Sequence, residues 1–590
     1  MRFFLPPIAD LIFVALFALL LFTNLSTTLL GDAGIGWHIR TGELILANRT
    51  IPHTDPFSSS SPFLSSRFSS TVGQPWFAWE WLYDVLVGTL DSLAGLNAVV
   101  AFTAVIIAAT FAFAFRLLQR RGTNLLIAVC LMLLAASASM IHFLARPHVV
   151  SWFFAVLWFW ILDCSERNPA DHDSDVAASR RFNSRLWLLP PLMLIWVNLH
   201  GGFLLGFVFL SIYWLSAVWE WWRLDLNRIE DALAKVRARQ RLRTLTLTGL
   251  LSALATIVNP YGIQLHAHIY RYLSNRFLMD HIDEFQSPNF HYVAQKCFAI
   301  LLLLSLLALA FKRSSIRASH LLLGLFAVYS GLYASRNIPV SSFLLILVIG
   351  PMLSSELGGI AKRFQFFERM DFLDSKLQGH LWPIVAVLLA GLVAVHPGRS
   401  GGMQWLNTHF DEKRFPVAAI DDLAKRDAQL SQGGVPNQPV SIFCPDSWGG
   451  YVIYRLYPNA KVVVDDRHDF YGEDFLRSYL KTMHATPGWD DFLAQHPARY
   501  VLVPKESPLA SVLLLTQHSC AKSSGELLLR FQPGRANDDE ATVFTGSAYR
   551  LEVERRRFSQ TPANGLPLRK PPQSVTAAEW RSQATWAGPR

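Results

Sequence analysis

Residues 8–45 decide the fold of this chain, and they read "IADLIFVALFALLLFTNLSTTLLGDAGIGWHIRTGELI". The apolar run at 8–30 is as long as a membrane span, because about 20 apolar residues in a helix cross the hydrocarbon core of a bilayer. Asp32 is the second residue after this run, and His38 and Arg40 follow it closely. The stretch therefore predicts a membrane helix that leaves the bilayer and at once presents a carboxylate, an imidazole and a guanidinium.

The composition extends this prediction to the whole chain. Of its 590 residues, 52% are hydrophobic and only 16% are charged, and the mean hydropathy is +0.27, whereas soluble proteins carry roughly 25% charged residues. The first apolar run has no small-residue cleavage site after it, which argues against a cleaved signal peptide. Hydropathy predicts a polytopic α-helical membrane protein with about eleven spans, near 8–30, 97–116, 124–142, 147–163, 186–199, 203–221, 244–258, 296–311, 319–334, 338–354 and 381–397.

Lysine and arginine in the loops indicate the orientation. With the N-terminus inside, the inner segments carry 22 of these cations and the outer loops carry 8, and loops rich in Lys and Arg stay on the cytoplasmic side. This bias places Asp32 and the C-terminal domain on the outer face. The inner loop 223–243 is typical of an amphipathic basic helix that lies on the membrane against anionic lipids. The net charge of +9 mostly reflects the same bias, so no nucleic-acid partner is predicted.

Polar side chains of catalytic type recur at the outer ends of the spans, while the inner loops look bland. The turn "IHFLARPHVV" contains Arg146 and His148, "WVNLHGG" contains Asn198 and His200, and "YASRNIP" contains Arg336. Each alone is explained by a helix cap or a packing hydrogen bond, but polar groups near the hydrocarbon are costly and tend to mark functional cavities. Their gathering on one face predicts that they line one cavity.

The first outer loop, at 31–96, is long and patterned. "TGELILAN" predicts a short helix, and "IPHTDPFSSSSP" is a turn rich in Pro and Ser that contains Asp55. "GQPWFAWEWLYDVLVGTL" is dense in aromatic residues, which favours an anchoring helix in the headgroup layer. The loop is therefore expected to lie along the membrane surface and to hold Asp32 at the edge of an amphiphilic groove.

From about residue 398 the chain reads as a soluble domain. "PVSIFCPD", "AKVVVDD", "RYVLVPK" and "ATVFTG" are typical of short buried strands, and "PVAAIDDLAKRD" and "GWDDFLAQH" are typical of helices. This alternation predicts an extracytoplasmic α/β domain at 398–557, followed by a disordered tail at 558–590. Cys444 and Cys520 fall in this domain, either as a disulfide or as two buried thiols.

Two of the predicted strands end in polar groups. The first is followed by "DSWGGY", with Trp448 and Tyr451, and the second by Asp466 and Arg467. If these strands are parallel, both tips lie at the sheet edge where α/β folds usually bind ligands. The alternative is a Gly turn plus a salt bridge that fixes the domain on the membrane part. No Gly-rich phosphate loop, zinc pattern or GxSxG elbow occurs in the sequence.

The chain resembles the GT-C glycosyltransferases, which are multi-spanning enzymes that use lipid-linked sugar donors. The resemblance covers the membrane part at 1–397 and rests on Asp32 at the end of the first span, on "GWHIRTGELILANRTIPHTDPFS" and on "GQPWFAWEWLYDVL". The loop looks most like that of bacterial GT-C-type proteins whose substrates are mostly unassigned. The resemblance implies that Asp32 acts as the catalytic base or orients the acceptor.

"DSWGGY" is distantly similar to the WWDYG motif of oligosaccharyltransferase catalytic subunits. Only Trp448, Gly449 and Tyr451 match that motif, so peptide recognition is not implied. Because Ala33 and Gly34 follow Asp32, the acidic metal-binding pair of those enzymes is not evident. The resemblance therefore requires no cofactor and leaves a divalent metal open, and no metal ligands are assigned.

Glycosyl transfer from a polyprenyl-phosphate sugar needs a base for the acceptor hydroxyl and cationic or hydrogen-bonding groups for the leaving phosphate. Asp32 supplies the base. Arginine suits phosphate because it binds through two parallel hydrogen bonds, and donor-phosphate binding is assigned to Arg146, His148, His200 and Arg336. Substrate binding is assigned to the other polar groups of the outer face, namely His38, Arg40, Asp55, Asn198, Trp448, Tyr451, Asp466 and Arg467.

The predicted reaction is inverting transfer to a glycan, lipid or protein acceptor of the cell envelope. It takes place at the outer face of a bacterial inner membrane, with the N-terminus in the cytoplasm and the C-terminal domain in the periplasm. Two alternatives stay open: a transporter or flippase for envelope lipids or glycans, and a GT-C-like scaffold without activity. A transporter should carry polar residues near mid-membrane and often repeats, and the polar-poor span centres favour the enzyme.

Overall fold

The computed structural model describes residues 4–60, 76–166, 184–224, 229–311, 316–361, 365–377, 380–395, 399–400, 403–404, 406–430, 439–515, 521–522, 526–533 and 549–551. Within these ranges, six helical segments are long and apolar enough to cross a membrane: Trp81–Arg120, Leu125–His142, His148–Glu166, Gly201–Arg223, Val293–Phe311 and Ser335–Leu357. Four shorter apolar helical segments accompany them: Ile8–Phe22, Arg185–Leu199, Ala318–Tyr333 and Leu381–Ala394. The prediction of a polytopic helical membrane protein is confirmed, with six clear candidate spans among the described residues where about eleven were predicted.

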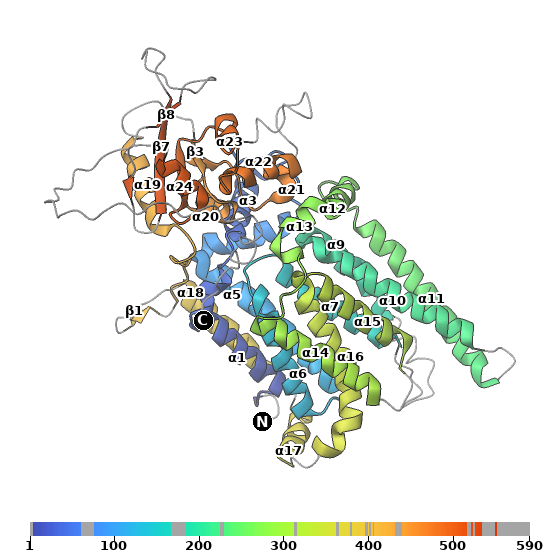
Figure 1. Cartoon of the computed structure of the whole chain (residues 1–590). Helices are drawn as coiled ribbons and strands as arrows, with labels where there is room; N and C mark the ends of the chain where they lie inside the picture. Colours follow the sequence, from blue (N-terminus) through green and yellow to red (C-terminus); the bar gives the residue numbers. More distant parts are fainter. Residues whose placement is uncertain are drawn as a thin grey trace, which may run out of the picture. The chain divides into compact units, whose positions relative to one another are not determined.

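These segments pack as one helical bundle (Figure 1). Helix α5 packs against α1, α7 and α18, and α16 packs against α6, α14 and α15. The helices of the bundle are α1 (Ile8–Phe22), α5 (Trp81–Arg120), α6 (Leu125–Ser139), α7 (His148–Glu166), α9 (Leu189–Leu199), α10 (Leu204–Arg223), α11 (Ile229–Ala255), α14 (Val293–Phe311), α15 (Ala318–Tyr333), α16 (Ile338–Ala361) and α18 (Leu381–Val395). Short segments connect them: α2 (Leu25–Leu29), α12 (Gln264–Ser274), α13 (Arg276–His281), α17 (Gln365–Ser375) and the 3-10 turns η1 (Met140–His142), η3 (Arg185–Leu188), η4 (Gly201–Phe203), η5 (Asp283–Phe285) and η6 (Ser335–Asn337).

Helix α11 corrects one prediction. The basic segment that was expected to lie on the membrane continues without interruption into the expected span at 244–258, and α11 packs against α9 and α10. No proline interrupts the segment, so a single helix forms. Arg241 on this helix is almost fully buried and pairs with Glu166 and Glu220, at 3.0 and 3.2 Å.

The helix ends that were predicted to face inward are not bland, which is a second correction. Asp163 and Glu166, both on α7, are buried there, and Asp163 pairs with Arg121 and with His320, the latter at 2.9 Å. These charged residues come from segments that are distant in the sequence, so the sequence alone does not reveal that they form ion pairs. Removing one partner of a buried ion pair is strongly destabilising, and we therefore read this inner cluster as structural.

The long first loop, at 31–96, supplies two helical surfaces. Helix α3 (Gly34–Asn48) contains the predicted short helix and begins earlier. The predicted aromatic helix and the second span form α5, interrupted at Ala94 and at Gly95, whose φ of 62° is readily adopted by glycine. Helices α3 and α5 pack closely at Gly42 and Gly88, where an added Cβ would collide with the opposite backbone.

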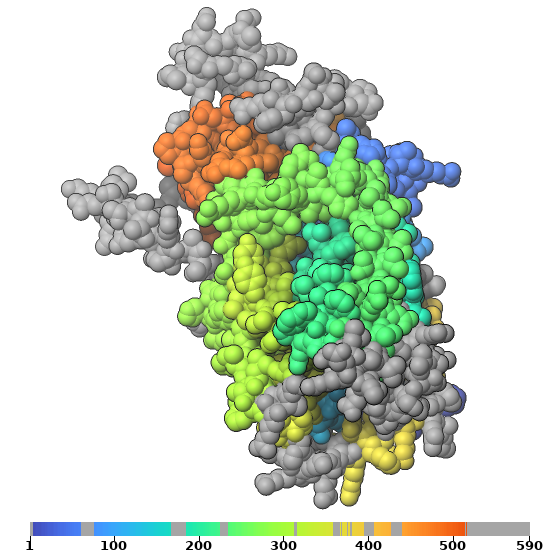
Figure 2. Space-filling view, turned by 90° about the vertical axis from the view of Figure 1, so that its right-hand side faces the viewer, coloured from blue at the N-terminus to red at the C-terminus, as the bar shows by residue number. Residues whose placement is uncertain are grey.

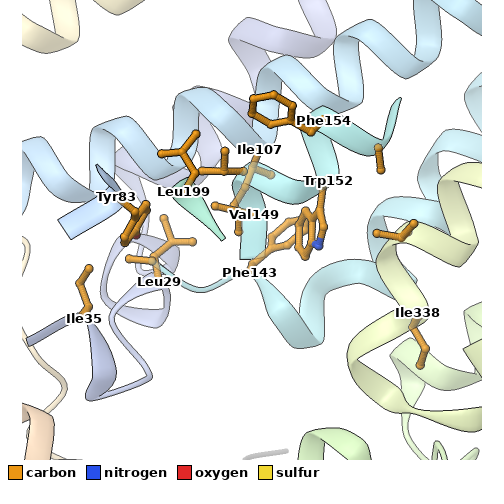
Figure 3. Packing of buried hydrophobic residues seen from close by; sticks show 14 of the residues in the cluster. Leu29, Ile35, Tyr83, Ile107, Phe143, Val149, Trp152, Phe154, Leu199 and Ile338 are labelled. Carbon is orange, nitrogen blue, oxygen red and sulfur yellow. The ribbon is translucent and has the colours of Figure 1, made fainter. Parts of the chain in front are cut away.

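The apolar core lies directly beneath these surfaces. Figure 3 shows buried side chains of this core, among them Leu29, Ile35 and Tyr83, and Phe143 beside Trp152. All five side chains are more than nine-tenths buried. The packed core leaves little freedom to the segments that carry Asp32 and Arg146, which adjoin it.

The C-terminal region contains the predicted α/β arrangement. Its sheet has the strand order β4-β3-β5-β7-β6, with β8 paired to β7. β3 is parallel to β4 and β5, and β7 is antiparallel to β5. The strands are β3 (Val440–Phe443), β4 (Ala460–Val462), β5 (Tyr500–Pro504), β6 (Ala521–Lys522), β7 (Glu526–Pro533) and β8 (Tyr549–Leu551), and a separate hairpin joins β1 (Arg399–Ser400) to β2 (Met403–Gln404). The helices of the region are α19 (Val417–Leu430), α20 (Asp446–Leu456), α21 (His468–Tyr471), α22 (Glu473–Met483), α23 (Asp490–Gln495) and α24 (Pro508–Leu515).

Three of the four expected strands are present as β3, β4 and β5. The fourth, "ATVFTG", lies outside the described residues, as do the tail at 558–590 and Cys520, so the boundaries of the domain stay predictions. Cys444 is a free thiol, which agrees with the thiol alternative and not with a disulfide. Cys444 is buried beside β3. Strand β7 was not predicted.

The first outer loop is attached to the edge of this sheet. Ser58 forms a parallel bridge with Val462 of β4, with hydrogen bonds from Val462 N to Phe57 O (3.1 Å) and from Ser59 N to Val462 O (2.8 Å). Arg467 bonds Asp55 at 2.8 Å and Asp465 at 2.6 Å, and all three side chains are at most 2% exposed. We call this trio the clamp, and it holds the residues after β4 against the loop that begins at Asp32.

Candidate functional site

A cavity of about 810 Å³ lies where the polar turns between the membrane helices meet the C-terminal region. In Figure 2 the surface is hollowed between α10 and α15, beneath the segment that contains α12. The polar groups at the ends of the spans were expected to line one cavity. Four of them do so: Asp32, Arg146, His200 and Arg336. It is also lined by four further residues predicted for the site: His38, His148, Asp466 and Arg467.

Arg146 is surrounded by three carboxylates. Its Nη1 lies 3.0 Å from Asp32 Oδ2 and 3.2 Å from Glu284 Oε1, and its Nη2 lies 3.5 Å from Asp466 Oδ2. The turn is held in place because Ala145 N donates to Leu29 O at 2.7 Å. Burial alone would lower the pKa of Arg146, but the three carboxylates raise it. This guanidinium therefore orders the acidic groups before any substrate arrives.

Asp32 and Asp466 face each other across Arg146. Asp32 Oδ1 accepts a hydrogen bond from Gly34 N at 2.8 Å, and Asp466 Oδ1 accepts one from Trp37 Nε1 at 3.0 Å. Burial and the nearby Asp32 carboxylate raise the pKa of Asp466 to about 7. Asp466 is therefore partly neutral at neutral pH.

Arg336 has a different environment. It comes from η6 and its guanidinium lies 4.5 Å from the centre of the Phe285 ring. Within the described part of the chain, its guanidinium has no ion pair and no hydrogen bond. It also lines the cavity. A cation that lacks a carboxylate partner is suited to bind an incoming anion, and the planar fork of arginine matches a phosphate.

A buried array of acid and imidazole groups forms another wall. Glu80 lies between His38 and His200, with Oε2 3.7 Å from His38 Nε2 and Oε1 3.6 Å from His200 Nε2. His38 Nδ1 lies 2.6 Å from Asp84 Oδ1, and His200 Nδ1 lies 2.7 Å from Ser151 Oγ. Burial raises the pKa of Glu80 to about 8, and burial lowers the pKa of both histidines well below the usual value.

Glu80 is also held by its neighbours in the chain. Ala78 N donates to Tyr261 Oη at 2.8 Å, and Trp81 Nε1 donates to Asn198 Oδ1 at 2.7 Å. Asn198 was predicted to bind substrate, but its amide also donates to two backbone carbonyls and the residue does not line the cavity. In the structure Asn198 therefore positions the segment that carries Glu80.

Four more predicted residues also lie away from the cavity. Arg40 pairs with Glu43 at 2.6 Å and bonds the carbonyl of Tyr454, and Asp55 belongs to the clamp. Trp448 Nε1 donates to Arg414 O at 2.9 Å, and Tyr451 is buried against Phe410 and Phe415. The substrate-binding assignment of Arg40, Asp55, Trp448 and Tyr451 therefore has no support from their positions.

The glycines of "DSWGGY" explain why this motif is a packing element. It starts helix α20, and an added Cβ on Gly450 would collide with the backbone of Ala33, while one on Gly36 would collide with Gly450 O. Gly449 likewise meets the backbone of Asp465. Of the alternative interpretation, a Gly turn plus a salt bridge that fixes the domain, the structure contains the salt bridge of Arg467 with Asp55, but the glycines lie in a helix and not in a turn.

Several cavity residues were not predicted. Besides Glu80, Asp84 and Glu284, they include Asp446, His468 and Asp469 on the C-terminal side. His468 pairs with Asp446 at 2.8 Å, and Asp469 pairs at 2.9 Å with His268 of α12, which does not line the cavity. Burial alone would lower the pKa of His468, but the hydrogen bond to Asp446 raises it. For Glu80 one signal existed in the sequence, because a lone acid in the aromatic stretch "WFAWEWLY" is costly unless it has a partner.

Neither a protein-family model nor a curated protein sequence matches the chain. Among solved structures it is similar to the Archaeoglobus fulgidus oligosaccharyltransferase tethered with an acceptor peptide that contains the NVT sequon. The TM-score is 0.51 at 12% identity, over 84% of this chain and 69% of that chain. The A. fulgidus oligosaccharyltransferase AglB in complex with an inhibitory peptide and a dolichol-phosphate gives 0.50 at 12% identity, over the same shares.

The fold is GT-C-like. The similarity to the archaeal oligosaccharyltransferase confirms the fold resemblance predicted from the first span and its loop. ArnT from Cupriavidus metallidurans in the apo state has a TM-score of 0.44 at 14% identity, over 88% of this chain and 97% of that chain. At these identities the likeness concerns the fold, and the chemistry must be argued from the cavity.

Proposed function

We propose that this protein is a membrane glycosyltransferase that transfers a sugar from a polyprenyl-phosphate donor to a cell-envelope acceptor, with inversion at the anomeric carbon. The proposal is supported by one observation, namely that two functional side chains line the same cavity. Asp32 offers a carboxylate for the acceptor hydroxyl, and Arg336 offers a guanidinium without a carboxylate partner among the described residues. These are the two functions that such a transfer requires.

The cavity wall also suits a donor with a lipid chain. On the side of α10 and α15 it is apolar, with Leu205, Val208 and Phe326, while Arg336 and His200 lie on its polar side. An isoprenoid chain can therefore pack between these helices while its phosphate meets the guanidinium. The archaeal enzyme of the same fold was solved with a dolichol-phosphate, which is consistent with a lipid phosphate here.

Asp32 is proposed as the base, and Arg146 as the group that orients it. Because Arg146 also bonds Glu284 and Asp466, it is more tightly held than Arg336 and is less available to a phosphate. The earlier assignment of Arg146 to the donor phosphate therefore moves to a role in ordering the acidic groups. His148 and His200 stay candidates for contact with the donor, since both line the cavity.

The orientation is part of the proposal. We place the N-terminus in the cytoplasm, the cavity and the C-terminal domain on the outer side, and about eleven crossings between them. The loop bias in Lys and Arg supports this topology. A periplasmic reporter fused after Ser400 should be active, and activity from a cytoplasmic reporter at the same site would refute the orientation.

The test is mass spectrometry of envelope glycans and polyprenyl-phosphate sugars in a strain that lacks the protein. We expect one glycan to lose a sugar and the corresponding polyprenyl-phosphate sugar to accumulate. Wild-type protein should restore the glycan, and Asp32→Asn should not, because a positioned general base contributes roughly 10²–10⁴ in rate.

Folding of the Asp32→Asn variant should be retained, since Arg146 keeps two other carboxylates. An unchanged glycan profile in the deletion strain would refute the proposed activity. Full rescue by Asp32→Asn would instead refute only the role of Asp32. Accumulation of an intact glycan on the inner side would favour a flippase.

A further inference from the structure

Arg146 holds together three acidic side chains from three separate parts of the chain. Asp32 follows α2, Glu284 lies in η5, and Asp466 follows β4. Asp32 Oδ2 and Glu284 Oε1 contact the same guanidinium nitrogen, Nη1, at 3.0 and 3.2 Å, and Asp466 Oδ2 lies 3.5 Å from Nη2. One cation therefore lies between the acids of the first loop, of a turn between membrane helices and of the C-terminal region.

Three convergent carboxylates are otherwise a ligand set for a divalent metal ion, because Mg²⁺, Mn²⁺ and Ca²⁺ prefer oxygen donors. Such an ion needs its oxygen ligands at about 2.0–2.6 Å from one centre. The three oxygen atoms around Arg146 are instead spread over two nitrogens of a planar group, at 3.0–3.5 Å. Among the residues that the structure describes, no group of three or more His, Cys, Asp or Glu side chains is arranged to hold a metal ion. As they stand, these acids fit a guanidinium and do not fit a metal.

The other carboxylate oxygens of Asp32 and Asp466 also accept N–H donors. Asp32 Oδ1 accepts a hydrogen bond from Gly34 N at 2.8 Å, and Asp466 Oδ1 accepts one from Trp37 Nε1 at 3.0 Å. Both carboxyl groups approach Gly34 so closely that a Cβ added there would lie 2.5 Å from Asp466 Oδ2 and 2.9 Å from Asp32 Oδ1. A metal ion would have to share these oxygens with the N–H groups and lie beside the guanidinium, whose positive charge would repel it.

The backbone of the turn also fixes the position of the guanidinium. Ala145 N donates to Leu29 O at 2.7 Å. Arg146 N donates to Leu144 O at 2.8 Å, and α7 begins two residues later. An arginine keeps its charge in a folded protein, and, unlike a metal ion, it cannot dissociate or be removed by a chelator.

From this arrangement we propose that Arg146 is a built-in cation that takes the place of a divalent metal ion, so that the wild-type protein orders the acids of its cavity without one. The cavity should therefore keep its geometry in the presence of a chelator. Loss of Arg146 should leave three carboxylates without their shared cation, and such a group attracts a divalent ion. The resemblance to GT-C enzymes left a divalent metal open, and the position of Arg146 argues against one at these three acids.

The test is Mn²⁺ binding, measured from the loss of the electron paramagnetic resonance signal of the free ion. The full-length protein is used in nanodiscs of phosphatidylcholine, whose headgroup carries no net charge. A pH of about 8 keeps Asp466 mostly ionised, because burial and the Asp32 carboxylate raise its pKa to about 7. Wild type should bind no Mn²⁺ at these acids. Arg146→Ala should bind one ion at least about tenfold more tightly than any site of wild type, because a like charge within about 4 Å of the ion is removed.

Two further variants show where the ion binds. Asp32→Asn in the Arg146→Ala background removes one of the carboxylates and should weaken Mn²⁺ binding by about tenfold or more. Arg455→Ala is the matched control. It frees only the carboxylate of Asp421, which is 41% exposed, and should create no Mn²⁺ site.

Thermal unfolding gives a second readout, which also covers a variant that is less stable. Mn²⁺ should raise the unfolding temperature of Arg146→Ala, because an ion that binds only the folded state stabilises it. Neither Mn²⁺ nor EDTA should shift the unfolding temperature of wild type. If Arg146→Ala does not fold, Arg146→Gln is used instead, since its amide still donates to a carboxylate but carries no charge.

Three results would overturn the inference: Mn²⁺ binding by wild type that Asp32→Asn abolishes, a lower unfolding temperature of wild type in EDTA, or no gain of Mn²⁺ binding in the neutral variants of Arg146. None of these measurements requires a sugar donor, so they are independent of the proposed transfer. If the Mn²⁺ results are as expected but deletion of the protein leaves the envelope glycans unchanged, the glycosyltransferase is wrong and the role of Arg146 stands.

Discussion

The clamp of Arg467, Asp55 and Asp465 allows a prediction whose size follows from the structure. Its three side chains are at most 2% exposed, and Arg467 is the cation that both carboxylates share. Removing one partner of a buried ion pair costs about 3–5 kcal/mol because a charge is left uncompensated. Arg467→Leu leaves two such charges, so we expect a loss of at least about 3 kcal/mol in local stability.

Hydrogen exchange of backbone amides is the suitable assay, because the clamp holds a defined bridge between Ser58 and Val462. At 1.4 kcal/mol per factor of ten, amides in residues 57–60 and 460–467 should exchange about 100-fold faster or more in Arg467→Leu. Asp55→Asn should have a smaller effect, near 1 kcal/mol, because Arg467 keeps both of its bonds to Asp465, at 2.8 and 2.6 Å.

Arg455→Leu is the matched control in the same region. Arg455 pairs with Asp421 at 2.5 Å, but both side chains are 41% exposed, and exposed pairs contribute about 0–1 kcal/mol. The expected order of exchange is therefore Arg467→Leu, then Asp55→Asn, then Arg455→Leu. Equal exchange in Arg467→Leu and Arg455→Leu would show that the loop is held by its backbone bridge and not by the clamp.

Two more predictions concern the cavity. Arg336→Lys keeps the positive charge but loses the planar fork, so undecaprenyl phosphate should bind about tenfold more weakly. Arg276→Lys, at a side chain that is 93% exposed, is the control and should not change binding. Equal binding by wild type and Arg336→Lys would refute a role for the planar guanidinium in binding the phosphate. The raised pKa of Asp466, about 7, means that folding favours its neutral form and that the fold loses stability as pH rises toward 7. Asp466→Asn should therefore stabilise the protein by roughly 2 kcal/mol more at pH 8 than at pH 5, as measured by thermal unfolding, and an equal effect at both pH values would contradict the shift.

Much of the fold could be predicted because length and apolar composition are sufficient for membrane helices. The runs that became α7, α10, α14 and α16 needed no knowledge of their partners. The joining of the basic segment and the seventh run into α11 was missed, since charge alone suggested a surface helix. The inner ion pairs of Asp163 and Glu166 were missed for a related reason, because their cationic partners come from remote segments.

The candidate site was predictable where one turn carried several polar groups. Arg146, His200 and Arg336 stood out because each interrupts an apolar context at the end of a span. Glu80 did not, since the aromatic residues around it predict an anchor and its histidine partners lie far along the chain. Tyr451 was overestimated because the glycines beside it serve the contact between α20 and α3, which a motif alone does not reveal.

The protonation states of the acidic residues that line the cavity decide whether it can bind an anion. With Glu80 and Asp466 ionised, their two carboxylates would add to those of Asp32 and Glu284 and would repel a phosphate, although Arg146, Arg336 and Arg467 also line the cavity. With Glu80 and Asp466 neutral, as their pKa values of about 8 and about 7 permit, Arg146 and Arg336 balance Asp32 and Glu284. Three further acids of the wall, Asp84, Asp446 and Asp469, each lie against a histidine. Binding of a lipid phosphate should therefore favour protonation of the cavity, and protonation should favour binding to the same extent, because linkage between the two is reciprocal.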